Sequence, residues 1–190
     1  MSILPIDTGR YGTKEMLDIF REQKKIDYQL DIEAAAALSQ SEIGLISASI
    51  AKDIARIAKS GKITAKRIKQ LEAKSDHDTA ALVEALAEKC NKESRPWIHY
   101  GLTSNDLVDT SNSMQMRDAI KIIQPKVSKL SLILAKNAVK HQSVPAVGRT
   151  HGQHASIISF GLKFANWASE MSTHLERLDE IKKRDRKSVV

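Results

Sequence analysis

Four of the six histidines lie in three short polar segments, and each segment is followed by a stretch with helical periodicity. The first N–H groups of a helix lack partners and its N-terminal end carries a partial positive charge, so these places attract carboxylates and phosphates. A histidine side chain titrates near neutral pH and can transfer a proton. The combination predicts acid–base chemistry on a substrate that carries several negative charges.

The segment GRTHGQHAS covers residues 148–156 and holds two histidines three positions apart. We predict that His151 delivers a proton to a leaving group and that Thr150 bonds to the substrate beside it. The two glycines of the segment would let the backbone approach closely. His154 is interpreted as structural support for this loop, and a buried, hydrogen-bonded ring is the competing interpretation for either histidine.

The segment SDHDTAAL begins at Ser75. Ser75 and Asp78 have the spacing of a capping box, which predicts a helix that starts at Ser75 with His77 in its first turn. For this segment alone, a well-capped helix with an exposed histidine is the simpler interpretation. The functional alternative makes His77 a hydrogen-bond donor to an anionic ligand.

The segment HYGLTSND begins at His99. Thr103 and Asp106 repeat the capping-box spacing, and Thr103 or Ser104 is expected to cap the helix that follows. Capping does not explain why His99 and Tyr100 stand beside a glycine turn. The two hydroxyl groups, with the backbone N–H groups that follow them, would hold a carboxylate.

Neither metal nor cofactor chemistry is predicted. His151 and His154 have no third ligand at a zinc-like spacing, and the sequence contains no HExxH pattern and no glycine-rich nucleotide loop. The single cysteine, Cys90, fits a reducing cytosol. We interpret it as structural, because no nucleophile–base pattern surrounds it.

The composition indicates a helical cytoplasmic protein. Aromatic residues make up only 4% of the chain, and glycine and proline are scarce, which favours helices over sheets. The chain has no apolar run of about 18 residues and no signal-peptide pattern, so no membrane association is expected. The net charge of +7 would attract anions, but no aromatic residues interleave the basic stretch 52–74, which argues against nucleic acid as a partner.

Hydrophobic periodicity predicts an all-α fold. Helices are expected over residues 13–40, 46–59, 64–74, 75–89, 103–121, 125–140 and from Ala155 onward. We expect the shorter helices to form a small N-terminal cap domain, residues 1–98. Residues 99–190 are expected to form the first part of a long-helix bundle.

The last expected helix carries an apolar seam. Its members alternate steps of four and three: Ile157, Gly161, Phe164, Ala168, Met171, Leu175 and Leu178. This is the a/d pattern of helices that pack against other helices. The neighbours can come from other copies of the chain, so a homo-oligomer is expected.

The segments VGRTHGQHA, WIHYGLTSNDLVDT and SDHDTAALVEAL resemble segments of the adenylosuccinate lyases, a family within the fumarase/aspartase superfamily. GRYG near the N-terminus resembles the Arg-Tyr pair with which that family opens, and the order along the chain agrees. The resemblance implies a fumarase/aspartase-like helical fold and a tetramer whose active sites each draw on three chains. It also implies β-elimination of fumarate from two purine nucleotide substrates, adenylosuccinate, which gives AMP, and the succinyl-carboxamide ribotide of purine synthesis.

The resemblance also implies roles for individual residues. His151 matches the family's general acid, and His77 matches a histidine that assists catalysis. The positions that match substrate-binding residues are Arg10, Tyr11, Asp76, Asp78, His99, Thr103, Ser104 and Thr150. Among these, Arg10 and Tyr11 match nucleotide-binding positions, and His99 matches a histidine near the phosphate.

The family's flexible loop, with its serine base and a sequence like GSSxMPxKxNP, does not occur in these 190 residues. We therefore expect a chain that is truncated relative to the family and inactive alone. Three alternatives stay open. They are another fumarate-releasing lyase of the superfamily, a non-catalytic helical oligomerisation remnant, and a basic nucleic-acid binder.

Overall fold

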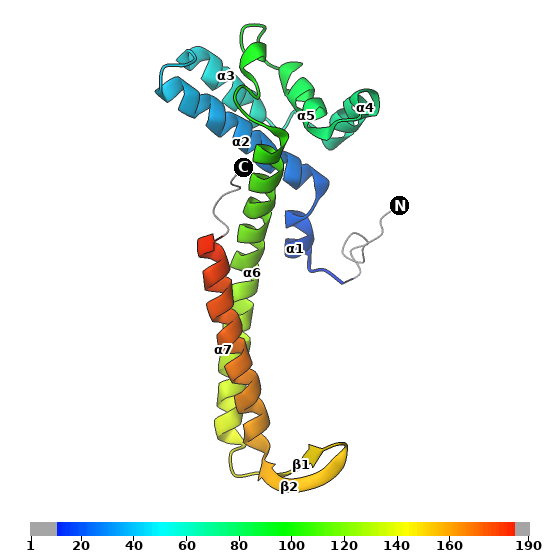
Figure 1. Cartoon of the computed structure of the whole chain (residues 1–190), viewed down its shortest axis with the longest axis vertical. Helices are drawn as coiled ribbons and strands as arrows, with labels where there is room; N and C mark the ends of the chain where they lie inside the picture. The colour runs from blue at the N-terminus through cyan, green and yellow to red at the C-terminus, as the bar shows by residue number, and fades with distance from the viewer. Residues whose placement is uncertain (1–10, 185–190) are drawn as a thin grey trace. The chain divides into compact units, whose positions relative to one another are not determined.

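The computed structural model describes residues 11–184, and most of these residues are helical (Figure 1). The elements are α1 (Lys14–Ile19), α2 (Glu22–Glu42), α3 (Ala48–Ala58), α4 (Ala65–Ser75), α5 (Asp78–Ala87), the short 3-10 helix η1 (Arg95–Trp97), α6 (Ser104–Lys140), β1 (Pro145–Thr150), β2 (Gln153–Ser159) and α7 (Phe160–Arg184). The expected helical class is confirmed, with the addition of one antiparallel two-stranded hairpin.

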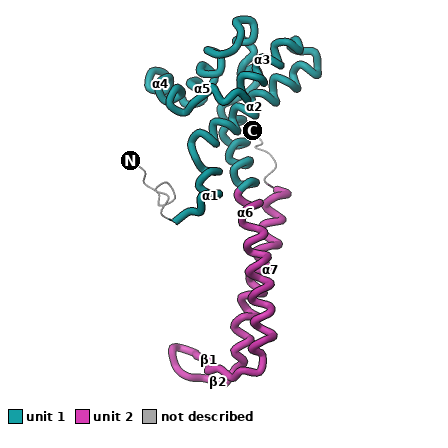
Figure 2. Tube along the Cα trace, turned by 180° about the vertical axis from the view of Figure 1, so that it is seen from behind, with its two compact units in different colours: residues 1–118, 186–190 teal, residues 119–185 magenta. Residues whose placement is uncertain are grey.

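The chain forms two compact units that divide between residues 118 and 119, inside α6 (Figure 2). The first unit contains α1 to α5, η1 and the beginning of α6. The second contains the rest of α6, the β-hairpin and α7. The domain division expected after residue 98 stays a prediction.

Hydroxyl side chains begin three helices of the first unit. Thr13, Ser47 and Thr64 each accept the backbone N–H of the residue three positions on, at 3.4, 3.4 and 3.3 Å. Such caps satisfy N–H groups that have no partner within the helix. The single helix expected over residues 13–40 is wrong, because Arg21 takes an extended backbone (ψ 142°) and separates α1 from α2.

Apolar side chains from α2 to α5 form the core of the first unit, where α2 packs on α3 and α4 packs on α5. The largest fully buried apolar side chains are Leu30, Ile54, Leu71, Leu82, Leu86 and Leu107. One charged side chain is as deeply buried as they are: Glu33 of α2 is 2% exposed. Its partner, described below, lies in the candidate site.

The second unit confirms the seam expected on the last helix. Within α7, Gly161 is buried and the other seam members are half-buried: Phe164, Ala168, Met171, Leu175 and Leu178. Phe160 at the start of the helix is also half-buried, and the remaining residues are exposed. A Cβ atom at Gly161 would overlap the carbonyl oxygen of Ala138 in α6, so the glycine permits the two helices to approach closely.

The expected start of the last helix at Ala155 is wrong. Residues 153–159 form β2, and the helix begins at Phe160. Ile157 and Ile158 pair across the hairpin with Val147 and Ala146, and β-branched residues favour such pairing. Ile157, the first member of the expected seam, is therefore 79% exposed on a strand.

Helix α6 is continuous from Ser104 to Lys140, so the break expected before Pro125 is wrong. A proline inside a helix removes one backbone hydrogen bond to the residue four positions earlier. Pro125 is exposed, and water can satisfy the carbonyl that loses its partner. Between residues 11 and 184, no helix is both long enough and apolar enough to cross a membrane.

Cys90 is 4% exposed, and burial, with Asp53 nearby, raises the pKa of its thiol from 9.0 to about 11. Only the thiolate reacts with a disulfide reagent, and a pKa near 11 lowers the thiolate fraction at pH 8 by about 100-fold relative to an ordinary thiol. We therefore expect 5,5′-dithiobis(2-nitrobenzoate) to label Cys90 about 100-fold more slowly in the folded chain than in urea. Equal rates in the two conditions would show that the thiol is accessible and reactive.

Candidate active site

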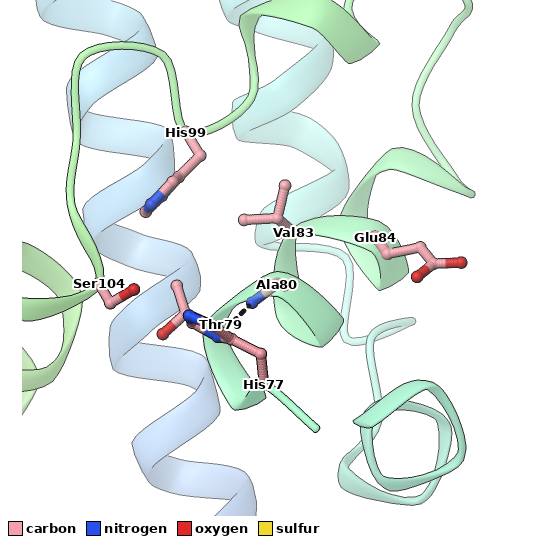
Figure 3. A pocket seen from close by; sticks show the side chains of 7 residues that line it. All are labelled: His77, Thr79, Ala80, Val83, Glu84, His99 and Ser104. Carbon is pink, nitrogen blue, oxygen red and sulfur yellow. Dashed lines mark hydrogen bonds between the residues drawn. The ribbon is translucent and has the colours of Figure 1, made fainter. Parts of the chain in front are cut away.

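A pocket with a volume of about 360 Å³ lies between the start of α5 and the loop that leads into α6 (Figure 3). It is lined by His77, Thr79, Ala80, Val83, Glu84, His99 and Ser104. In Figure 3, the side chain of His99 points down from its loop, and that of His77 points up from the start of α5. Ser104 lies at the side. Three of the residues expected from the sequence to bind or act on a substrate therefore share one cavity.

His77 is the N-cap of α5, and its ring Nδ1 accepts the backbone N–H of Ala80 at 3.3 Å. The capping box expected between Ser75 and Asp78 is wrong. Ser75 ends α4, and Asp76 takes a left-handed conformation (φ 51°) between the two helices. Because Nδ1 accepts this hydrogen bond, a neutral His77 ring carries its own proton on Nε2, where it can donate to a ligand.

The two aspartates beside His77 do not line the pocket. Asp76 is exposed as the C-cap of α4. Asp78 is also exposed, and its Oδ1 accepts the backbone N–H of Thr79 at 2.6 Å. Both carboxylates stand at the edge of the helix start, and their expected contact with substrate stays a prediction.

His99 is held by the buried carboxylate of Glu33. The backbone N–H of His99 donates to Oε2 of Glu33 at 2.9 Å, and the ring Nδ1 lies 2.7 Å from Oε1. The residue has a φ of 61°, in the left-handed region that non-glycine residues rarely adopt. The two hydrogen bonds that Glu33 accepts stabilise this conformation and orient the ring.

Glu33 is not among the site residues expected from the sequence, although one signal for it exists. Ile26, Leu30, Glu33 and Ala37 follow steps of four, three and four along α2, and all four are buried. A carboxylate at a core position of a helix needs a partner, because burying an unpaired charge is costly. The pattern predicts a buried polar contact but does not reveal that the partner is His99.

Asp106 connects to Thr103 as the capping-box spacing predicts. Its Oδ2 accepts the backbone N–H of Thr103 at 2.8 Å and the Thr103 hydroxyl at 3.3 Å. The Thr103 hydroxyl is thus engaged within the chain, and Thr103 does not line the pocket. Ser104, the first residue of α6, does.

Thr150 and His151 lie at the tip of the β-hairpin in the second unit. Thr150 pairs with Gln153, so His151 and Gly152 form a two-residue turn, and both have positive φ (50° and 73°). This is the geometry of a type I′ turn, which matches the twist of an antiparallel hairpin. The side chain of His151 is exposed, as is that of His154.

The two glycines of this segment have different roles. A Cβ atom at Gly148 would lie 2.8 Å from the carbonyl oxygen of Ser156, at the point where the strand register shifts. Gly148 thus permits a close cross-strand approach at a β-bulge. Gly152 has open space around it and supplies positive φ instead, so the expected close approach holds for Gly148 only.

Two expected residues, Arg10 and Tyr11, come from the N-terminal segment. Arg10 is outside the described residues, and Tyr11 is 73% exposed and does not line the pocket. Residues 11–184 contain no group of three or more histidine, cysteine, aspartate or glutamate side chains placed to hold a metal ion. The pocket itself therefore offers two imidazoles, two hydroxyl groups, an apolar wall and one carboxylate.

Residues 9–190 match a protein family described as Lyase. The chain belongs to this lyase family of the fumarase/aspartase superfamily. It is 44% identical over 184 residues to an adenylosuccinate lyase of Methanocaldococcus jannaschii. It is also 40% identical over 176 residues to an N-acetyl-S-(2-succino)cysteine lyase of Enterococcus italicus.

These lyases are longer than the chain. The alignments cover 97% and 93% of the chain but only 40% and 38% of the two relatives. A crystal structure of a fumarate lyase from Mesorhizobium sp. BNC1 has the same fold over 92% of the chain and 42% of that protein, with a TM-score of 0.83 and 30% identity. The helical fold of the superfamily is thus confirmed for this chain.

Proposed function

We propose that the protein to which these residues belong is an adenylosuccinate lyase. It eliminates fumarate from adenylosuccinate, giving AMP, and from the succinyl-aminoimidazole-carboxamide ribotide of purine nucleotide biosynthesis. The observation that carries the proposal is the pocket that His77, His99 and Ser104 line together. The adenylosuccinate lyase relative adds support for this choice of substrate within the lyase family.

The pocket suits a substrate with a phosphate and two carboxylates. Ser104 begins the 37-residue helix α6, where free backbone N–H groups and the helix dipole favour an anion. We propose that Ser104 and His99 bind the phosphate, and that His77 donates from Nε2 to a carboxylate and assists catalysis. Asp76, Asp78 and Thr103 border these residues in the chain, and Arg10 and Tyr11 complete the proposed substrate-binding set.

The reaction needs a base and an acid. The base removes a proton from the carbon next to a carboxylate, the C–N bond breaks as the C=C bond of fumarate forms, and the acid protonates the departing nitrogen. We propose His151 as this acid, with Thr150 bonding to the substrate beside it. The type I′ turn presents the exposed imidazole at the tip of a hairpin, where an incoming substrate can reach it.

We further propose that the enzyme is a homotetramer in which each active site draws on three chains. The pocket of one copy and the hairpin of another can then contribute to one site. Large apolar side chains remain exposed in the second unit, among them Leu132 (56%), Val139 (66%) and Trp167 (49%). Exposed apolar surface of this kind is typical of helices that pack against further helices. A cytoplasmic location, without metal, cofactor, membrane or nucleic acid, belongs to the same proposal.

A second candidate is a lyase for a succinylated thiol. The relative from Enterococcus italicus is nearly as similar to the chain as the adenylosuccinate lyase is. The substrate in its name joins the succinyl group to sulfur and includes no phosphate. Affinity for a nucleotide phosphate therefore distinguishes the two candidates.

Calorimetric titration with AMP tests the proposal. We expect AMP to bind, and we expect Ser104→Ala to weaken binding about tenfold, the value of one hydrogen bond to a charged group. Ser128→Ala, at an exposed position of the same helix, should leave affinity unchanged. Binding of a succinylated thiol without binding of AMP would favour the second candidate. Binding of neither would favour a non-catalytic helical remnant.

A further inference from the structure

Between residues 11 and 184, Glu33 is the one deeply buried carboxylate whose hydrogen bonds both go to a residue of the candidate pocket. It is 2% exposed on α2, among apolar neighbours such as Leu30 and Ala34. Both of its oxygens contact His99, one at the backbone N–H and one at ring Nδ1. A buried charge is costly unless it is paired, and here the pairing extends from the core of the first unit to the pocket.

The two contacts specify more than the position of His99. An ionised carboxylate only accepts hydrogen bonds, so Nδ1 of His99 must be the ring nitrogen that carries a proton. Nε2 is then the nitrogen that remains for a ligand. The ring is 21% exposed and lines the pocket with His77 and Ser104 (Figure 3).

The other histidine of the pocket is held in the opposite way. His77 accepts a backbone N–H at Nδ1, so its neutral ring carries the proton on Nε2. The pocket thus contains one imidazole held by a neutral backbone donor and one held by a carboxylate. Asp78 Oδ1 lies 3.7 Å from Nδ1 of His77, but both side chains are exposed. His99 instead pairs at 2.7 Å with a buried carboxylate, and in its imidazolium form Nε2–H can donate to an anion while Nδ1–H donates to Glu33.

We propose that Glu33 is a positioning residue for anion binding: it fixes the proton of His99 on Nδ1, directs Nε2 to the pocket and balances the charge of the ring when an anion binds. The inference rests on the proposed function only for the identity of the anion, a phosphate group. The hydrogen-bonding arrangement itself is tested without any ligand.

Glu33→Gln is the informative variant because it keeps the shape of the side chain. The glutamine oxygen must face the backbone N–H of His99, which leaves the amide NH₂ group for Nδ1. Since an NH₂ group donates, the neutral His99 ring must move its proton to Nε2. Nitrogen-15 NMR of the imidazole rings should therefore show Nδ1 protonated in the native chain and Nε2 protonated in the variant.

Titration with inorganic phosphate provides the second readout. We expect Glu33→Gln to weaken phosphate binding about tenfold, because the charge-assisted hydrogen bond becomes a neutral one. Glu42→Gln, at an exposed position on the same helix, is the matched control and should change neither readout.

Each result bears on the proposal. If Nδ1 of His99 carried no proton in the native chain, the proposal would be overturned, even if the variant did not fold. A folded variant with an unchanged ring proton would overturn it as well. A switched proton with unchanged phosphate affinity would overturn the role in anion binding. If the ring protons are as expected but AMP does not bind, the result would count against the proposed substrate and not against the role of Glu33.

Discussion

His151→Asn lowers the rate of fumarate release from adenylosuccinate by about 10²- to 10⁴-fold, the range typical for loss of a general acid. The asparagine amide cannot protonate a departing nitrogen. Asparagine followed by glycine is also a preferred type I′ turn, so the hairpin that carries position 151 should keep its geometry. The measurement is the steady-state rate in the complete enzyme that contains these residues.

His154→Asn is the control for this variant. His154 is three positions away, on β2, and its side chain is exposed. We expect this substitution to change the rate by less than about threefold, as for an exposed position outside the reacting groups. Retention of more than a tenth of the native rate by His151→Asn would assign the acid to another group.

His99→Asn destabilises the chain by about 3 kcal/mol, because it removes the ring that pairs with a buried carboxylate. Asparagine tolerates the left-handed conformation that position 99 requires (φ 61°), so the loss reports the missing imidazole rather than backbone strain. Urea unfolding followed by circular dichroism and by tryptophan fluorescence measures the change. Trp97 lies two positions before His99 and reports on the first unit.

Two further variants separate the charge effect from other causes. In a Glu33→Gln background the carboxylate is gone, and we expect His99→Asn to cost less than about 1 kcal/mol more. His174→Asn, at an exposed position of α7, should change stability by less than about 0.5 kcal/mol. An equal loss for His99→Asn with and without the carboxylate would contradict the assignment of Glu33 and His99 as a pair.

Local signals in the sequence predicted much of the helical framework. Thr13, Ser47 and Thr64 begin helices close to the expected positions, because a hydroxyl that accepts an N–H needs only residues three positions away. The apolar seam of α7 was also predictable from its spacing. It identifies the buried face of the helix whatever packs against it.

The errors arose where several local signals compete. Residues 153–159 fit a helical seam, but the β-hairpin turn at His151 and Gly152 pairs them with β1. Ser75 has the type and spacing of a cap, yet the left-handed Asp76 ends α4 there and leaves His77 as the cap of α5. The cap of α5 thus lies two residues later than expected, at His77, whose side chain lines the pocket.

The sequence predicted which residues belong to the candidate site, but it predicted their arrangement in space only partly. The sequence segments of His77, His99 and Ser104 each indicated an anion site, and the structure places these three in one cavity. The pairing of Glu33 with His99 spans 66 positions of the chain, and no local pattern specifies such a partner. Long-range contacts of this kind follow from the packing of α2 against the loop before α6.

The most direct test of the proposed function is to measure fumarate and AMP together after the complete enzyme is incubated with adenylosuccinate. We expect equal amounts of the two products, and we expect N-acetyl-S-(2-succino)cysteine to release fumarate far more slowly. Equimolar fumarate and AMP would establish β-elimination at the C–N bond of the nucleotide. Absence of fumarate from adenylosuccinate, with release from the thiol compound, would contradict the account and assign the chain to a different lyase of the superfamily.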